Sequence, residues 1–259
     1  MSGDKLLLVD RELGTATITL NRPEAFNSLS VELLGLLEDT LDAIAEDPQV
    51  RVVVLTGRGK AFCAGHDLKE MGADLAYEPI RALFAHCSRV MQKIMRLPQP
   101  VIARVDGIAT AAGCQLVAAC DLAICSGDSR FATSGVKYGL FCSTPMVALS
   151  RNVGRKLAME MLLTGDFIDA ERALAHGLVN RVVAKEELDA AVADLASRLI
   201  EKPPAVLALG KRAFHEQLEL GVEQAYEMTT EVIVQNALGA DFEEGLKAFT
   251  EKRKPVWPG

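Results

Sequence analysis

The sequence predicts an α/β fold with a smaller all-helical segment at its C-terminal end, and three observations support this. Apolar segments of strand length alternate with amphipathic segments of helix length up to residue 202. Two of the strands end in turns of small residues that open directly into helices. The double proline Pro203-Pro204 then ends a helix, and every later element reads as helical. We therefore expect a core over residues 1–202 and a helical domain over residues 203–259.

The first elements are two strands and a helix. Lys5–Asp10 is the first strand, and Thr15–Leu20 pairs with it, because Thr alternates there with apolar residues as in a half-buried strand. After a loop, Ser30 is expected to cap a helix that runs to Ala45. The buried face of this helix is predicted to consist of Leu33, Leu34, Leu37, Leu41 and Ile44.

The next strand leads into the first small-residue turn. Residues 49–56 form an apolar strand, and the loop after it ends in a short helix over Asp67–Met71. A long amphipathic helix follows over Glu78–Leu97, with Pro79 in its first turn. Its methionines repeat with the apolar residues and are interpreted as core.

The stretch from Val101 to Ser126 contains the second such turn. It reads as a strand over Val101–Val105, small residues at 109–113, a buried helix over Ala112–Cys120 and a strand over Asp121–Cys125. A helix that begins on small residues presents free backbone N–H groups, which suits an oxygen that gains negative charge. Together the two turns can point two N–H groups at one oxygen, and each such donor lowers a barrier by roughly 3 kcal/mol. The alternative is a packed turn that binds no ligand.

After this stretch the chain continues with short strands and then with helices. They are a strand at Arg130–Thr133, a segment Val136–Thr144 that leads into a helix ending at Arg151, helices at Leu157–Leu163 and Ala170–Ala175, an extended segment at Arg181–Val183, and helices at Glu186–Lys202, Ala205–Leu220, Glu223–Gly239 and Asp241–Lys252.

Composition and charge argue against several classes of protein. With 259 residues and 49% hydrophobic content, the chain can bury a full core. Its formal net charge of −7 argues against general binding to nucleic acid or to an anionic membrane. No apolar stretch has the length to span a bilayer, and MSGDKLLLVD has neither a secretory nor an Arg-rich targeting pattern. We expect a soluble, cytoplasmic protein.

Motif spacing argues against metals, disulfides and nucleotide sites. The histidines form no HExxH pattern, and we expect no metal. The chain lacks GxGxxG, GxxxxGK[ST] and GxSxG, so a dinucleotide site, a phosphate-binding loop and a hydrolase serine have no support. Buried free thiols are expected at the six cysteines, which show no CxxC spacing: Cys63, Cys87, Cys114, Cys120, Cys125 and Cys142.

Five segments, in order along the chain, resemble one family. They are NRPEAFN at residues 21–27, AFCAGHDLKEM at 61–71, DGIATAAGCQLVAACDLAI at 106–124, residues 165–183 with AHGLVNRVV, and FTEKRKPVW at 249–257. On these segments the chain resembles the crotonase (enoyl-CoA hydratase/isomerase) superfamily, and AAGCQL, FATSGV, GLFCSTP and KRKPVW indicate one subgroup of it. The resemblance implies a crotonase-like spiral of ββα units with a small C-terminal helical domain that forms trimers and covers CoA. It also implies an acyl-CoA or enoyl-CoA substrate that includes coenzyme A, no separate cofactor, and a homotrimer or a dimer of trimers.

The resemblance places an oxyanion hole on two backbone amides. The family's first donor follows the Gly of the AFxAG run, which makes it His66, and the second falls on Ala112. Because both contribute backbone N–H groups, their side-chain types are no obstacle. Substrate contacts are carried over to Arg22, Ala25, Ala64, Asp67, Leu68, Tyr138, Phe249 and Lys252, the last two in some members next to the CoA of a neighbouring subunit. For Arg22, the alternative to a substrate contact is a solvated surface charge.

The chain departs from the family at two carboxylates. The family's hydratases place two glutamates around one water, but the matching positions are Gln115 and Gly135. An amide is neither acid nor base near neutral pH, and glycine has no side chain, so efficient hydration is not expected. Cys142, Ser143 and Thr144 lie where other members keep acids or nucleophiles, and Tyr138 precedes them. No sequence feature activates them, and pocket lining or core is the alternative.

Three functions stay open at this point. The first is an acyl-CoA enzyme that nominally hydrates 2-enoyl-CoA to 3-hydroxyacyl-CoA, with weak or altered activity. The second is another enolate-based reaction of an acyl-CoA, decarboxylation or thioester hydrolysis, which needs the oxyanion hole but not the glutamate pair. The third is a non-catalytic protein that binds acyl-CoA.

Overall fold

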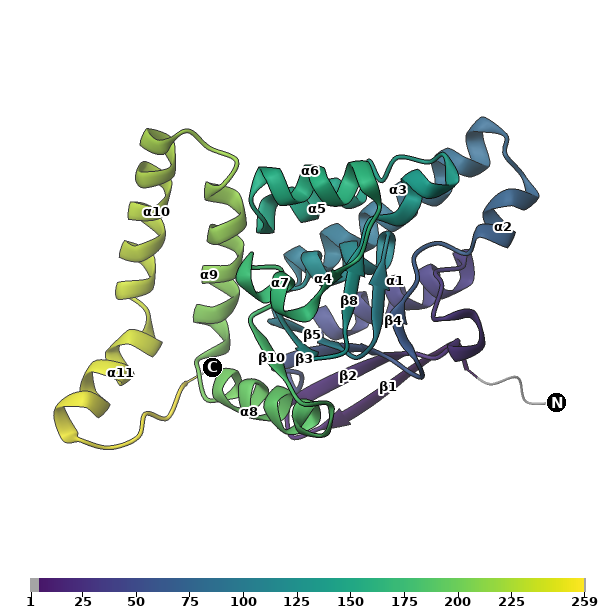
Figure 1. Cartoon of the computed structure of the whole chain (residues 1–259). Helices are drawn as coiled ribbons and strands as arrows, with labels where there is room; N and C mark the ends of the chain where they lie inside the picture. Colours follow the sequence, from purple (N-terminus) through teal and green to yellow (C-terminus); the bar gives the residue numbers. More distant parts are fainter. Residues whose placement is uncertain (1–4, 259) are drawn as a thin grey trace.

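The computed structural model describes residues 5–258, and its strands form two sheets (Figure 1). The larger sheet has the order β1-β2-β3-β5-β7-β10, and only its β1–β2 pair is antiparallel. The strands of the larger sheet are β1 (Leu7–Glu12), β2 (Thr15–Leu20), β3 (Val52–Gly57), β5 (Val101–Val105), β7 (Leu122–Ser126) and β10 (Arg181–Val183). The smaller sheet consists of β4 (Ala61–Cys63), β6 (Ile108–Thr110), β8 (Arg130–Ala132) and β9 (Ile168–Asp169).

From β3 to β8, consecutive strands alternate between the two sheets. β3, β5 and β7 lie in the larger sheet, and β4, β6 and β8, which follow them in the chain, lie parallel in the smaller one. Helices follow each strand pair, so the chain winds as a spiral of ββα units, as predicted. These helices are α2 (Leu68–Ala73) and α3 (Tyr77–Arg96) after the first pair, α4 (Ala112–Ala119) after the second, and α5 (Pro145–Asn152), α6 (Arg155–Thr164) and α7 (Ala170–Ala175) after the third.

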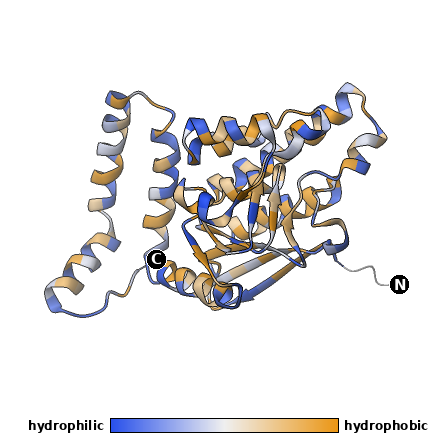
Figure 2. Cartoon of the chain, viewed as in Figure 1, coloured by the Kyte–Doolittle hydropathy of each residue, from blue (hydrophilic) through white to orange (hydrophobic). Residues whose placement is uncertain are grey.

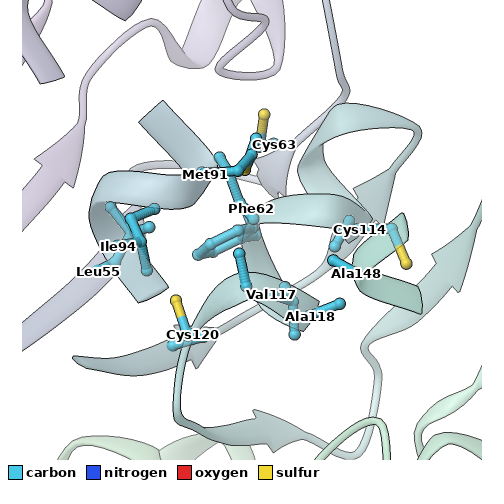
Figure 3. Close-up of a cluster of buried hydrophobic side chains, with 14 of the residues drawn as sticks. Leu55, Phe62, Cys63, Met91, Ile94, Cys114, Val117, Ala118, Cys120 and Ala148 are labelled. Atoms are coloured by element: carbon cyan, nitrogen blue, oxygen red, sulfur yellow. The ribbon is translucent and has the colours of Figure 1, made fainter. Parts of the chain in front are cut away.

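Helices on both faces of the larger sheet bury the core. α1 (Val31–Ala45) begins as predicted, since the Ser30 Oγ accepts a hydrogen bond from the Leu33 N–H at 3.1 Å, and its five predicted core residues are buried. The fully buried Phe62 ring lies among side chains of α3 and α4, including Ile94 and Val117 (Figure 3). On the opposite face, α8 (Leu188–Ile200) packs on the apolar side chains of β3, β5 and β7.

Three helices end the chain. They are α9 (Pro204–Gln217), α10 (Val222–Ala237) and α11 (Ala240–Glu251). α9 packs beside α3, whereas α10 and α11 extend away from the sheets (Figure 1). The Lys211 ammonium anchors α9, because it is 2.6 Å from a carboxylate oxygen of Asp121 and donates hydrogen bonds to the Ile94 and Gln99 carbonyls.

The structure differs from the sequence prediction mainly at short strands. β4 and β6 were predicted as small-residue loops, but they pair with each other and build the second sheet. Three-residue strands are too short for a periodic pattern to reveal them. The six cysteines are buried and free, as predicted. Within residues 5–258, no helix combines the length and the apolar character that crossing a membrane requires.

Candidate active site

The two predicted turns meet at the ends of β4 and β6. Gly65 has a φ of +94°, a conformation that glycine adopts without strain. A Cβ added there would lie 2.9 Å from the Ala111 Cβ and 3.3 Å from the Ala112 nitrogen. The backbone before His66 therefore lies against the backbone at the start of α4, and no side chain fits between them.

The start of α4 is packed against β4. A Cβ on Gly113 would overlap the Cys63 carbonyl oxygen. The residue before the helix, Ala111, has a φ of +51°, which is rare for a residue with a side chain and costs of order 1–3 kcal/mol. Strained backbone of this kind persists where surrounding structure holds it, and it is common at active sites.

Two backbone amides at this junction have no partner within the described residues. Leu29 N–H donates to the Gly65 carbonyl at 2.7 Å, and Asp67 N–H donates to the Leu29 carbonyl at 3.0 Å. These bonds bracket His66, whose own N–H has no acceptor in the described part of the chain. Ala112 is the first residue of α4, so its N–H has no acceptor within the helix, and none is found among residues 5–258.

A cavity of about 350 Å³ opens at this junction. Eight of the predicted site residues line it: Ala64, His66, Leu68, Ala112, Gly135, Tyr138, Cys142 and Ser143. Ala111, from the small-residue turn, and Thr144, next to Ser143, also line it. Sequence reasoning did not assign six further wall residues to the site: Met71, Phe84, Ser134, Leu140, Phe141 and Pro145. Phe84 had a weak signal as an apolar position of the α3 helix, whereas Leu140 and Phe141 lie in a loop whose place only the fold decides.

Gln115 and Arg22 do not line the cavity. Gln115 is 4% exposed on α4, and its Oε1 is buried without a hydrogen-bond partner among the described residues. Arg22 is bound within the chain, since its guanidinium donates to the Ser28 carbonyl at 2.6 Å and to the Asp67 carboxylate at 2.9 Å. The contact of Arg22 with CoA stays a prediction, and the donors of its guanidinium are directed inward.

Four other predicted contacts also lie outside the cavity wall. Ala25 is in the short 3₁₀ segment η1 (Pro23–Ala25), and Asp67 caps α2 by accepting from the Lys69 and Glu70 amides. Phe249 and Lys252 lie at the end of α11, which packs on α10, far from α2 and the cavity (Figure 1). One chain does not bring these two residues to its own cavity, because α9 to α11 lead away from it.

The position of the second missing glutamate is closed by packing. Gly135 lies in the 3₁₀ segment η2 (Ser134–Tyr138), and a Cβ on it would overlap the Leu140 carbonyl oxygen and lie 2.8 Å from the Cys142 sulfur. The Gly135 N–H donates to that sulfur at 3.3 Å. Any side chain at residue 135 requires the 140–142 loop to move, so glycine is a requirement of this loop.

Burial favours the neutral forms of two titratable groups of the cavity, His66 and Cys142. Burial lowers the pKa of His66 to about 4, and its ring makes an edge-to-face contact with Phe84, with ring centroids 5.1 Å apart. Burial raises the pKa of the Cys142 thiol, and the Gly135 N–H offsets this only in part. No carboxylate, lysine or arginine is among the lining residues that the structure describes.

The neutral state of His66 predicts a pH dependence of stability. Its pKa is about 4 in the folded chain, against a reference of about 6.5 in an unfolded one. The unfolded chain therefore binds more protons between these values, and folding stability falls as the pH decreases. We expect this group to lower the free energy of unfolding by about 2 kcal/mol between about pH 7 and about pH 5.

Urea unfolding at the two pH values measures this effect. His66→Gln should remove it, while the same replacement of the exposed His176 is the control. An unchanged pH dependence in His66→Gln would contradict the assignment.

Comparison with known proteins shows the family to which the chain belongs. A family model described as enoyl-CoA hydratase/isomerase matches residues 10–259. The chain is 46% identical over 252 residues to enoyl-CoA hydratase domain-containing protein 3, mitochondrial, of Xenopus laevis, covering 97% of this chain and 86% of that protein. It is 33% identical to crotonyl-CoA hydratase of Syntrophomonas wolfei, covering 96% of each chain.

Solved structures agree with this comparison. A structure described as enoyl-CoA hydratase of Mycobacterium smegmatis superposes with a TM-score of 0.96 at 54% identity, covering 99% of this chain and all of that one. Human enoyl-CoA hydratase domain-containing protein 3 superposes with a TM-score of 0.94 at 42% identity, covering 98% of this chain and all of that one. The subgroup indicated by AAGCQL and KRKPVW is that of domain-containing protein 3, and the match confirms it.

The comparison contradicts the predicted cytoplasmic location. The relatives from X. laevis, Danio rerio and Homo sapiens that match along most of the chain are all named as mitochondrial proteins. The prediction depended on the composition of the first ten residues, of which residues 1–4 lie outside the described part. Such a short segment does not specify a compartment.

Proposed function

Since the chain belongs to the enoyl-CoA hydratase/isomerase family, we propose that it binds an acyl-CoA thioester and stabilises its enolate with the backbone amides of His66 and Ala112. The observation that carries the proposal is the pair of N–H groups without acceptors beside a cavity. As the thioester oxygen becomes anionic, two fixed donors in a site shielded from water stabilise it more than they stabilise the neutral carbonyl. The acyl group occupies the cavity, and CoA is part of the substrate, so this role requires no separate cofactor.

We propose that hydration of 2-enoyl-CoA is the nominal reaction and that it is slow. A water that adds to the double bond must lose a proton, and the α-carbon must gain one. The described lining residues hold no carboxylate for either transfer, and burial keeps His66 uncharged. Because a positioned acid or base contributes roughly a 10²–10⁴-fold rate increase, hydration without one is expected to be slower by a factor of that order.

Binding and hydration are tested with crotonyl-CoA. We expect thermal stabilisation of the protein by acyl-CoA at high concentration, about 2.7 kcal/mol at one hundred times Kd. We also expect slow formation of 3-hydroxybutyryl-CoA. No stabilisation by any CoA thioester would refute the proposed site. Hydration at the rate of a two-glutamate enzyme would refute the role given to Gln115 and Gly135.

Decarboxylation is a second candidate, favoured by the absence of an ionised base among the described lining residues. In a malonyl-type thioester the bond between the α-carbon and the carboxylate carbon breaks and CO₂ leaves. The electron pair of this bond forms the enolate, whose negative charge lies on the thioester oxygen. The oxyanion amides then stabilise the enolate, and a proton from solvent completes the product. Conversion of malonyl- or methylmalonyl-CoA without hydration of crotonyl-CoA would favour this reaction. Release of free CoA would indicate a thioesterase, and tight binding without turnover a binding protein.

We propose that the chain forms a homotrimer or a dimer of trimers. Large apolar side chains are exposed along the C-terminal helices, among them Val222, Tyr226, Leu238 and Phe249, with Leu238 84% exposed. Figure 2 shows hydrophobic residues (orange) distributed along the ribbons of these helices. Covering this surface in an oligomer removes apolar area from water. It would also allow Phe249 and Lys252 to lie beside the CoA of a partner subunit.

Light scattering measures the mass of the assembly. We expect Tyr226→Lys with Leu238→Lys to reduce the mass toward that of one chain. Leu13→Lys, at a residue equally exposed in the β1–β2 turn, is the matched control and should leave it unchanged. A wild-type protein that is monomeric at high concentration would contradict the proposal.

A further inference from the structure

The guanidinium of Arg22 is committed to the turn that carries the oxyanion amide of His66. One amino group donates to the Ser28 carbonyl at 2.6 Å, and the other lies 2.9 Å from the Asp67 carboxylate. The side chains of Arg22 and Asp67 are each 17% exposed, so the pair is mostly removed from water. A guanidinium used in this way has little capacity left for a phosphate.

Asp67 connects this ion pair to the amide. It is the residue after His66, and its carboxylate also accepts the Lys69 and Glu70 amides at the start of α2. Its own N–H donates to the Leu29 carbonyl, and the Leu29 N–H donates to the Gly65 carbonyl. The peptide units on both sides of His66 are therefore fixed, and the direction of the His66 N–H depends on them.

The other end of Arg22 is fixed by Asn27. The fully buried Asn27 accepts the Arg22 backbone N–H at 2.9 Å and donates to the Ala61 carbonyl at 2.7 Å. Ala61 is the first residue of β4, the strand that precedes the turn. Both the backbone and the side chain of Arg22 thus hold the segment from β4 to α2.

We propose that Arg22 is a positioning residue for the oxyanion amide of His66, acting through Asp67, and not a contact of the CoA phosphates. The inference rests on the proposed function. It explains why an arginine and an aspartate 45 positions apart pair beside a turn whose amide lacks an acceptor. An arginine matches a carboxylate with a fixed, planar set of donors, which a lysine or glutamine does not.

Two thioesters separate positioning from phosphate binding. Crotonyl-CoA and crotonyl-pantetheine share the reacting group, but the second lacks the nucleotide phosphates. We expect Arg22→Gln to lower the hydration rate of both thioesters to the same extent, roughly ten- to a hundredfold, with little change in KM. Complete loss of one oxyanion donor costs about 10²–10³ in kcat, and a misdirected donor loses part of this. A loss confined to crotonyl-CoA and expressed in KM would overturn the proposal.

A spectroscopic measurement reports the amide directly. The absorption of a bound dienoyl-CoA shifts to longer wavelength when its carbonyl is polarised, and this shift should be reduced in Arg22→Gln. Asp67→Asn keeps the helix cap but removes the charge, so it should reproduce the effect in a folded protein, and the double variant should add nothing to it. Arg11→Gln, which breaks a longer and more exposed Arg–Asp pair with Asp47, is the control and should leave the shift unchanged.

The outcomes distinguish this inference from the proposed function. If wild-type protein binds neither thioester, the proposed function fails and the inference fails with it. If wild-type protein binds and polarises the dienoyl group but Arg22→Gln and Asp67→Asn do so equally well, only the inference fails.

Discussion

Gly113→Ala is expected to destabilise the protein by roughly 3 kcal/mol or more and to abolish binding of acyl-CoA. The added methyl group would overlap the carbonyl oxygen of Cys63, which is backbone and cannot rotate away. The start of α4 would have to separate from β4, and the Ala112 N–H would move with it. Urea unfolding gives the stability, and thermal stabilisation by crotonyl-CoA gives the binding.

A second helical glycine provides the matched control. Gly35 lies within α1, and a Cβ on it would meet no atom within 4 Å. Gly35→Ala should therefore stabilise the chain by about 0.5–1 kcal/mol, because alanine loses less conformational entropy in a helix. If Gly113→Ala were as stable as Gly35→Ala, α4 would not contact β4 as described.

Lys211→Met is expected to destabilise the protein by about 3–5 kcal/mol, because it leaves one partner of a buried ion pair without the other. The Lys211 side chain is 8% exposed, and its ammonium is the partner of Asp121 and of the Ile94 and Gln99 carbonyls. Methionine retains the length of the side chain but supplies no donor. Since Lys211 is in α9, its loss should also weaken the attachment of the C-terminal helices, which light scattering and urea unfolding together will report.

A Lys–Asp pair whose lysine is exposed is the control. Lys185 lies 2.9 Å from Asp106, but its side chain is 59% exposed, so Lys185→Met should cost no more than about 1 kcal/mol. Asp121→Asn should recover part of the stability lost in Lys211→Met, because it removes the uncompensated charge. Equal losses for Lys211→Met and Lys185→Met would contradict the buried anchor.

The site was predicted from sequence to different degrees at different residues. His66, Ala112 and Gly135 occur in short motifs, and the structure brings all three to one cavity. Arg22 also occurs in such a motif, but a motif does not show whether a charged side chain points to a ligand or to Asp67. Phe141 occurs in the GLFCSTP motif, but the motif does not show that its side chain lines the cavity, because that depends on the packing of a loop.

The sequence by itself determined the helices, the long strands and the family. Helical and strand periodicity are properties of neighbouring residues, so they can be read along the chain, as in the buried face of α1. Only the tertiary structure decided the second sheet, the partners of Arg22 and the reason for glycine at residue 135, where the Leu140 carbonyl leaves no room. The second sheet and the Arg22–Asp67 pair depend on contacts between segments distant in the chain, and the packing of residue 135 against residue 140 depends on how an irregular loop folds. Neither kind of contact leaves a periodic trace in the sequence.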